Sequence, residues 1–226
     1  MINKKFGGIF LKYFYKKNFS IVEATTKELK EICYNIRYKV FYEEKKMIER
    51  KYVNEEKFTE NNDDDKNSTQ FLIYDKKYKK YIGTIRVVNI KSKSKPPALR
   101  NFDDSIYDDL SQEFGIDFNS EVEISRVSVL KCERFYERKK SPPPSLFLYL
   151  YAGAYIYTQG KERSVAIMNA ALNSHLNKLG IPTIKISEDV NLFGKRSIYI
   201  VDIKNYHDNL PSLVKPVCQY FLRLNK

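Results

Sequence analysis

The chain has 226 residues, of which 42% are hydrophobic, enough to bury one sizeable core. Its formal net charge of +12 fits either an acidic partner or a lysine-rich composition without functional meaning. No apolar run approaches the roughly 20 residues of a membrane-spanning helix. The 3 cysteines lack metal-type spacing and there are only 2 histidines, which argues against a zinc site or a disulfide framework. We therefore expect a reducing, cytoplasmic location, no metal site and no bound cofactor.

Residues 1–18 are predicted to form a basic N-terminal arm. Its apolar piece at residues 6–11 is short and lacks the small-residue cleavage site of a signal peptide. Two interpretations stay open: the arm packs on the domain, which we favour, or it makes peripheral contact with a membrane surface. Residues 19–226 are predicted to form a single domain.

The first half of the domain alternates strands with an amphipathic helix. Residues 19–23 are a predicted strand, and Thr25 or Thr26 can cap a helix whose apolar residues recur at helical spacing as far as Val40. Residues 54–68 are predicted to be a solvated acidic loop. Strands at residues 69–74 and 81–90, joined by a lysine-rich turn, form a hairpin.

The second half supplies a crossover. The prediction places helical turns within residues 99–114, strands at 121–130, 164–168, 181–186 and 197–203, and helices at 145–157, 170–179 and 213–224. This order predicts an α/β (α+β) fold. We expect a mixed, mostly antiparallel central sheet that is flanked by helices on both faces and contains one parallel crossover.

The strand at residues 121–130 combines the alternation of a strand with charged side chains. Glu123, Ser125 and Arg126 lie within four positions of it. Charges on a central strand are costly unless they are paired, so Glu123 and Arg126 are candidate functional residues and Arg86 needs a carboxylate partner. Strict alternation puts Glu123 and Arg126 on opposite faces, so a shared site requires a β-bulge between them.

Short motifs follow one another in a fixed order within residues 19–203. They are Ile36-Arg37-Tyr38-Lys39-Val40-Phe41 with Glu44, then Asp65, then Ile82-Gly83-Thr84-Ile85-Arg86, then Glu123-Ile124-Ser125-Arg126. This set resembles the N-acyl amino acid synthase and N-acylhomoserine lactone synthase group of GNAT acyltransferases, which includes exosortase-associated acyltransferases.

The resemblance implies a GNAT-like fold, with a β-bulge on the strand of Glu123, and transfer of a fatty acyl group. The donor is the 4'-phosphopantetheine thioester of acyl carrier protein, or acyl-CoA. The acceptor is the amine of a small molecule: an amino acid in one branch, S-adenosylmethionine in the lactone synthases. Acyl carrier protein and the small acceptor are thus the implied partners, and the acyl thioester is a co-substrate.

The family pattern maps onto Arg37, Asp65, Arg86, Glu123 and Arg126, and the needs of thioester aminolysis suggest roles for individual residues. Glu123 is the expected base, acting through water, and Arg86 and Arg126 would hold Glu123 or an acceptor carboxylate. Backbone N–H groups near Ser125 to Val127 are expected to receive the oxyanion. We thus list Glu123, Arg126, Arg86 and Ser125 as catalytic, and Arg37, Phe41, Asp65 and Val127 as substrate-binding. Arg37 and Asp65 are expected to pair and to order a loop.

The sequence departs from the family pattern in ways that bear on the substrates. Asn62 stands where the family has a further acid, and Gln70 or Phe71 stands where it has a His or an aromatic residue. The chain has no Trp, which argues against the S-adenosylmethionine pocket of lactone synthases. Residues 131–140 contain no glycine to cradle the pyrophosphate of free coenzyme A, and their basic residues suit an acidic carrier protein.

Other interpretations stay open. The chain can be a lactone synthase, an acetyltransferase that uses free coenzyme A, or a non-catalytic GNAT-like binding module whose charged residues only stiffen the fold. A nucleic-acid partner is not expected, because the lysines are scattered and the aromatic residues are predicted to be buried.

Overall fold

The computed structural model describes residues 4–47, 53–54, 59–60, 66–89, 112–115, 121–131, 142–192 and 194–225. The strands are β1 (Phe19–Glu23), β2 (Val53–Asn54), β3 (Thr59–Glu60), β4 (Ser68–Asp75), β5 (Lys80–Asn89), β6 (Val122–Val129), β7 (Arg163–Met168), β8 (Thr183–Lys185), β9 (Val190–Asn191) and β10 (Lys195–Asp202). The helices are α1 (Lys4–Asn18), α2 (Lys27–Arg37), the π-helix η1 (Tyr38–Glu44), α5 (Pro144–Thr158), α6 (Ala170–Lys178), α7 (Ile203–Asp208) and α8 (Lys215–Leu224).

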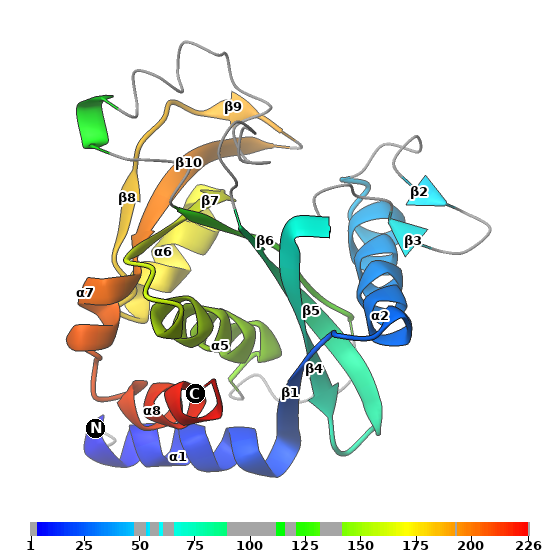
Figure 1. The fold of residues 1–226 in the computed structure, drawn as a ribbon, viewed down its shortest axis with the longest axis horizontal. Coiled ribbons are helices and arrows are strands. Elements are labelled where there is room, and N and C mark those ends of the chain that lie inside the picture. Colours follow the sequence, from blue (N-terminus) through cyan, green and yellow to red (C-terminus); the bar gives the residue numbers. More distant parts are fainter. Residues whose placement is uncertain are drawn as a thin grey trace.

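One large mixed sheet runs through the molecule (Figure 1). Within the described ranges its strand order is β1-β4-β5-β6-β7-β10-β8, and β9 pairs with β10. Every pairing is antiparallel except that of β6 with β7, which are parallel and are joined through α5. This confirms the predicted mostly antiparallel sheet with one parallel crossover.

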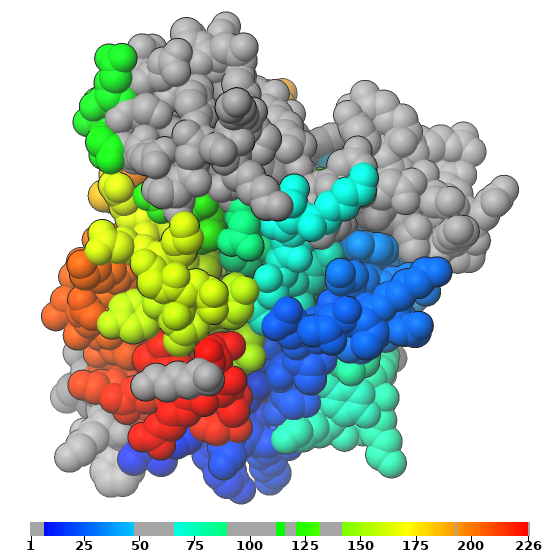
Figure 2. Space-filling view, viewed as in Figure 1, coloured from blue at the N-terminus to red at the C-terminus, as the bar shows by residue number. Residues whose placement is uncertain are grey.

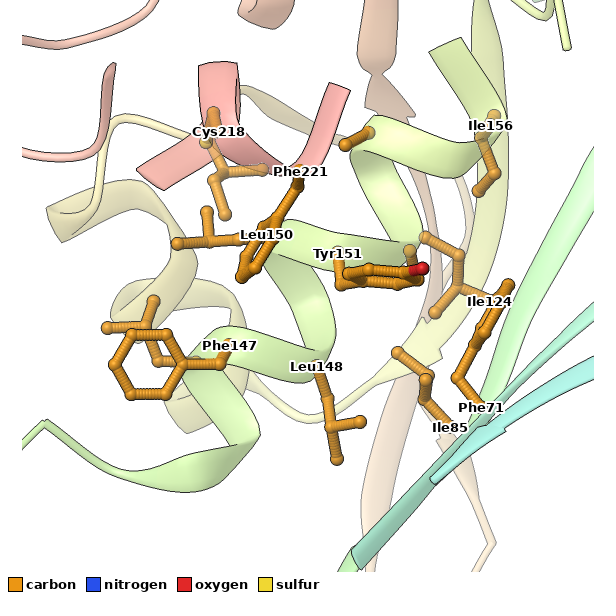
Figure 3. Close-up of a cluster of buried hydrophobic side chains, with 14 of the residues drawn as sticks. Phe71, Ile85, Ile124, Phe147, Leu148, Leu150, Tyr151, Ile156, Cys218 and Phe221 are labelled. Carbon is orange, nitrogen blue, oxygen red and sulfur yellow. The ribbon is translucent and has the colours of Figure 1, made fainter. Parts of the chain in front are cut away.

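Helices cover both faces of this sheet. On one face, α5 packs against Phe71, Ile85 and Ile124 of the sheet, and α8 covers α5 from outside through Phe221 (Figure 3). On the other face, α2 and η1 pack on β4 through an apolar cluster of Ala24, Cys33, Ile36, Val40, Phe41 and Leu72. A separate apolar cluster of Val165, Ile186, Ile198 and Ile200 involves β7 and β10.

Local signals account for several element boundaries. Thr26 caps α2, since its hydroxyl accepts a hydrogen bond from the Leu29 backbone N–H at 3.3 Å. Gly180 follows α6 with φ +76°, a conformation that glycine adopts without steric cost. The N-terminal arm is helical over α1, and its Leu11 and Tyr15 belong to the main core cluster.

Four predictions of local structure need correction. The α-helix of residues 27–37 does not continue to Val40, because the chain widens into the π-helix η1. The acidic segment predicted as a loop contains the paired strands β2 and β3. The strand predicted at residues 181–186 is reduced to the short strand β8. The strand predicted to run to Ile203 ends at Asp202, because the Asp202 carboxylate accepts a hydrogen bond from the Asn205 N–H at 3.0 Å and so caps α7.

Of residues 99–114, only 112–114 lie in the described part, and they are helical. Within the part of the chain that the structure describes, no helix is long and apolar enough to cross a bilayer.

Candidate functional site

A buried polar cluster occupies the α2-facing side of the sheet. In the β4–β5 ladder Gln70 lies opposite Arg86, and in the β5–β6 ladder Arg86 lies opposite Ser125 and Val88 opposite Glu123. Because paired residues point to the same face, Gln70, Arg86, Ser125 and Glu123 share one face. Arg86 Nε donates to Ser125 Oγ at 3.0 Å. Arg86 and Glu123 are only 2% and 3% exposed, so this polar group lies in the interior.

A β-bulge on β6 decides where Arg126 points. Thr84 pairs with Ser128 and Arg86 with Ser125, so β6 has one more residue than β5 over this stretch. Arg126 takes up that extra residue with φ +55°, in the left-handed region that non-glycine residues rarely adopt. Its guanidinium carbon lies 5.8 Å from the centroid of the Phe41 ring on η1. The bulge therefore brings Arg126 to the side of the sheet that carries Glu123, as the predicted shared site requires.

The helical segment α2–η1 covers the polar cluster on the side that faces away from the sheet. Arg37, the last residue of α2, is fully buried, and its guanidinium carbon lies 5.0 Å from the centroid of the Tyr34 ring. Phe41 is 8% exposed and belongs to the apolar cluster beneath α2. The π-helical widening thus occurs at the residues that face the sheet's polar cluster. Such local widenings of a helix are frequent at functional sites.

The strands β6 and β7 stay paired only at their starts. Their ladder consists of Val122 with Ser164 and Glu123 with Val165. At the same end, the Arg163 guanidinium contacts the Glu121 carboxylate at 3.1 Å, which ties the two strands together. Glu123 therefore sits at the point where the described strands separate, and the bulge follows immediately on the separating part of β6.

Cationic side chains gather at the outer end of this site. Lys45 Nζ lies 5.4 Å from the centroid of the Phe41 ring, on which Arg126 also stacks. Burial lowers the pKa of Lys45, and the nearby positive charge of Arg196 lowers it further. Lys131 Nζ lies 3.8 Å from the Glu44 carboxylate. This cationic group, defined as Lys45, Arg126, Lys131 and Arg196, makes the region suited to anionic groups.

Gln70 is the unusual polar residue of the cluster. It is 2% exposed, and within the described residues neither its amide oxygen nor its amide nitrogen has a hydrogen-bond partner. A buried amide without partners costs about 1–3 kcal/mol. The sequence left Gln70 and Phe71 as alternatives for one family position. Gln70 lies on the face of Arg86, whereas Phe71 belongs to the core on the α5 face.

The remaining predicted residues are placed differently. Val127 packs against the core on the α5 face, so its side chain does not join the cluster, and only its backbone remains as a candidate for substrate contact. Asp65, and with it the expected pair with Arg37, lies outside the described residues. Residues 132–140 of the basic loop also lie outside them. No group of potential metal ligands occurs among the described side chains.

Sequence reasoning missed the contribution of Lys45, Arg196 and Glu121. Arg196 directly precedes the strand predicted at residues 197–203, and nothing in the sequence indicates what its side chain faces. Lys45 is part of a charged run typical of a solvated helix, and only the fold brings it close to Arg196. Glu121 precedes β6 by one residue, and its role appears only when β7 lies alongside.

Comparisons with known proteins bear on the fold of the chain. Residues 36–137 match the acetyltransferase (GNAT) domain family. No curated protein matches the sequence.

Several solved structures share the fold. The CoA-dependent acyl-homoserine lactone synthase BjaI, solved with SAM and isopentyl-CoA, superposes with a TM-score of 0.62 at 16% identity, over 91% of this chain and 89% of its own. The AHL synthase LasI gives 0.59 at 14% identity, over 82% and 89%. FeeM, an N-acyl amino acid synthase from uncultured soil microbes, gives 0.59 at 12% identity, over 85% and 95%. At these identities the likeness establishes a common fold.

Proposed function

We propose that this chain, an acyltransferase with a GNAT domain, moves a fatty acyl group from a pantetheine thioester to the amine of an amino acid or a related small acceptor. The observation that carries the proposal is the convergence of Glu123, Arg86 and Arg126 on one face, beside the point where β6 separates from β7. A buried carboxylate beside guanidinium groups and strand backbone outside a ladder supplies a base, an anion clamp and oxyanion donors.

The reaction is aminolysis of a thioester. Glu123 takes a proton from the acceptor ammonium, through a water molecule, and the freed amine attacks the carbonyl carbon. The C–N bond forms as the carbonyl oxygen becomes an oxyanion, which backbone N–H groups of residues 125–127 stabilise. The intermediate collapses, the C–S bond breaks and the sulfur leaves with its electron pair. The nitrogen then loses its second proton; of the two protons released, one ends on the thiol and the other passes from Glu123 through water to solvent.

The arginines position the reactants. Arg86 is held in orientation by its hydrogen bond to Ser125, which fixes its guanidinium on the face of Glu123. Arg126 is held between the bulge and the Phe41 ring. A planar guanidinium matches a carboxylate with two parallel hydrogen bonds, so an acceptor that carries a carboxylate next to its amine fits this arrangement.

Acyl carrier protein is the proposed source of the acyl group. The support is the cationic group around η1 together with the basic, glycine-free residues 131–140, because carrier proteins present an acidic surface. Acyl-CoA is the competing donor, and BjaI is named as CoA-dependent.

The lactone synthases provide a second candidate function, in which S-adenosylmethionine is the acceptor. The observation in its favour is that LasI and BjaI share this fold as closely as FeeM does. The observation against it is the absence of Trp from the whole sequence.

The deciding experiment measures acyl transfer with purified protein. Long-chain acyl carrier protein and the matching acyl-CoA are each offered with an amino-acid mixture or with S-adenosylmethionine, and products are identified by mass spectrometry. We expect N-acyl amino acids, formed faster from the carrier protein. An acyl-homoserine lactone as the main product would replace the proposed acceptor, and no product from any pairing would favour the non-catalytic module.

Glu123→Gln tests the base, with Glu121→Gln as the matched control. Both glutamates are buried at the start of β6, but the Glu121 carboxylate contacts Arg163 of β7 at 3.1 Å. We expect E123Q to lower kcat by about 100-fold, the usual scale of general-base catalysis, and E121Q to leave kcat unchanged. Unchanged turnover in E123Q would remove Glu123 as the base.

A further inference from the structure

The outward side of α1 exposes large apolar residues. Ile9, Phe10 and Tyr13 are 59%, 57% and 61% exposed, and their spacing places them along one side of the helix. We call these three residues the α1 ridge. Leu213 and Leu224, at the two ends of the neighbouring α8 region, are also 44% and 49% exposed. Among the described residues, most of the exposed large apolar side chains thus lie on these two terminal segments.

The same two segments are basic and lack acids. Residues 1–22 contain Lys4, Lys5, Lys12, Lys16 and Lys17 and no Asp or Glu. Residues 209–226 contain Lys215, Arg223 and Lys226, again without an acid. The terminal segments therefore carry eight positive charges, most of the chain's formal +12. Lys12, Lys16 and Lys17 lie on the same helix as the α1 ridge, and positive charge next to an apolar ridge is the combination that binds the interface of an anionic bilayer.

The helix that carries the α1 ridge is already packed against the core through its opposite side. The inward side of α1 buries Leu11 and Tyr15 in the main core, and the Tyr15 ring packs edge-on against Phe221 of α8 at 4.8 Å between centroids. Lys12 and Lys16 lie 5.6 and 5.4 Å from the centroid of the Tyr220 ring. Figures 1 and 2 show α1 and α8 side by side at one end of the molecule.

We propose that the α1 ridge and its lysines form a peripheral membrane-binding surface for anionic lipid bilayers. The ridge would insert Ile9, Phe10 and Tyr13 at the level of the headgroups, and the lysines would contact lipid phosphates. Residues that protrude from a packed helix suit a deformable lipid surface better than a protein partner, which needs a matching hollow. The proposal does not depend on the acceptor or donor of the transfer reaction.

The test is flotation of the full chain with vesicles of phosphatidylcholine alone or of phosphatidylcholine and phosphatidylglycerol at about 7:3, in low salt and in about 0.5 M salt. We expect binding to the anionic vesicles that weakens in high salt. The triple variant I9S/F10S/Y13S should bind at least about tenfold more weakly. Ile184→Ser, at an apolar residue 51% exposed on β8, is the matched control and should bind like wild type.

Two matched charge-reversal variants provide a further test. Lys17→Glu reverses a charge on exposed α1 surface, whereas Lys178→Glu makes the same change on exposed α6. Only the first should reduce binding to anionic vesicles. Circular dichroism and acyl transfer to a soluble acceptor confirm that each variant is folded. The proposal is overturned if wild type does not float with anionic vesicles in low salt, or if the triple variant floats equally well. It is also overturned if the triple variant changes only the oligomeric state or carrier-protein binding.

Discussion

At the scale of single residues, the candidate site contains two residues in unfavourable local states. Arg126 adopts φ +55° in the middle of a strand, and Gln70 buries an amide with no partner among the described residues. Each state costs free energy that a purely structural role would not require. Such costs are typical of positions that are kept for binding or catalysis.

Replacing Arg126 by glycine or by alanine separates the effect of the backbone conformation from the effect of losing the guanidinium. R126G and R126A both remove the charge, but glycine adopts positive φ freely, so R126G should be more stable than R126A by about 1 kcal/mol. Both should lose most of their transfer activity. Urea unfolding and kcat/KM measure the two effects. Ser128 is the control on the same strand: S128G should be less stable than S128A there. Full activity in R126G would leave Arg126 a structural role only.

Gln70→Leu should raise the stability of the protein and lower its acyl-transfer activity. Leucine has a similar size and replaces an unsatisfied buried amide, so the free energy of unfolding should rise by about 1 kcal/mol. If Gln70 contacts the acceptor, the acceptor KM should rise while the donor KM stays constant. Thermal unfolding and steady-state kinetics in each substrate provide the measurements. A drop in stability would show that the amide has a structural partner.

At the scale of elements, the parallel pair β6–β7 depends on a short contact at its start. The ladder has only two residue pairs, and the Glu121–Arg163 contact lies beside them. On the α5 side, His207 anchors α7: its ring lies 4.9 Å from the Tyr157 ring, and a Cβ on Gly153 of α5 would lie 3.4 Å from its Nε2. Each contact holds together elements that are distant in sequence.

Breaking the β6–β7 contact should cost stability but not chemistry. E121Q should lower the free energy of unfolding by about 1 kcal/mol, a modest value because Arg163 is 35% exposed. A double-mutant cycle with R163Q measures the coupling between the two residues. A coupling energy near zero would mean that the contact does not hold the strands together.

His207 should make stability depend on pH. Burial lowers the pKa of its imidazole from 6.5 to about 4. The unfolded chain therefore binds this proton below about pH 6.5, and the folded chain does not until about pH 4. Stability should fall as the pH falls from 7 to 4, by about 3 kcal/mol from this residue. Urea unfolding of wild type and H207F at several pH values isolates the effect. Parallel pH curves for the two proteins would contradict it.

At the scale of the whole molecule, the two terminal helices complete the same layer. Gly8 permits this, because a Cβ there would lie 2.5 Å from the Ser212 carbonyl oxygen and 2.9 Å from Pro216 Cδ. The layer buries Leu11 and Tyr15 and leaves the α1 ridge outside. The docking of α1 therefore fixes the orientation of the proposed membrane-binding surface relative to the sheet.

Gly8→Ala should release α1 from this layer. A backbone oxygen cannot move aside as a flexible side chain does, so we expect a loss of about 1–3 kcal/mol in the free energy of unfolding. Proteolysis near the N-terminus should become faster. Phe10→Ala, at an exposed position on the same helix, should change stability by less than about 0.5 kcal/mol. Equal effects of the two substitutions would argue against tight docking through Gly8.

Much of the fold was predictable because its signals are local. The alternation at residues 121–130 predicted β6, residues 19–23 were predicted as the strand that forms β1, and of the two predicted caps, Thr25 and Thr26, it is Thr26 that begins α2. The π-helix and α7 were missed. Both arise where packing overrides the periodicity: η1 widens where Phe41 meets the sheet, and Asp202 caps a turn that reads as strand.

The sequence by itself determined which chemical groups are available: the charges on a central strand, the basic terminal segments and the order of motifs that resemble acyltransferases. Only the tertiary structure decided which of these groups meet. Alternation alone separates Glu123 from Arg126, and the pairing register with β5 joins them by inserting one residue. Register is set by contacts between strands that are distant in the sequence, so no local pattern contains it.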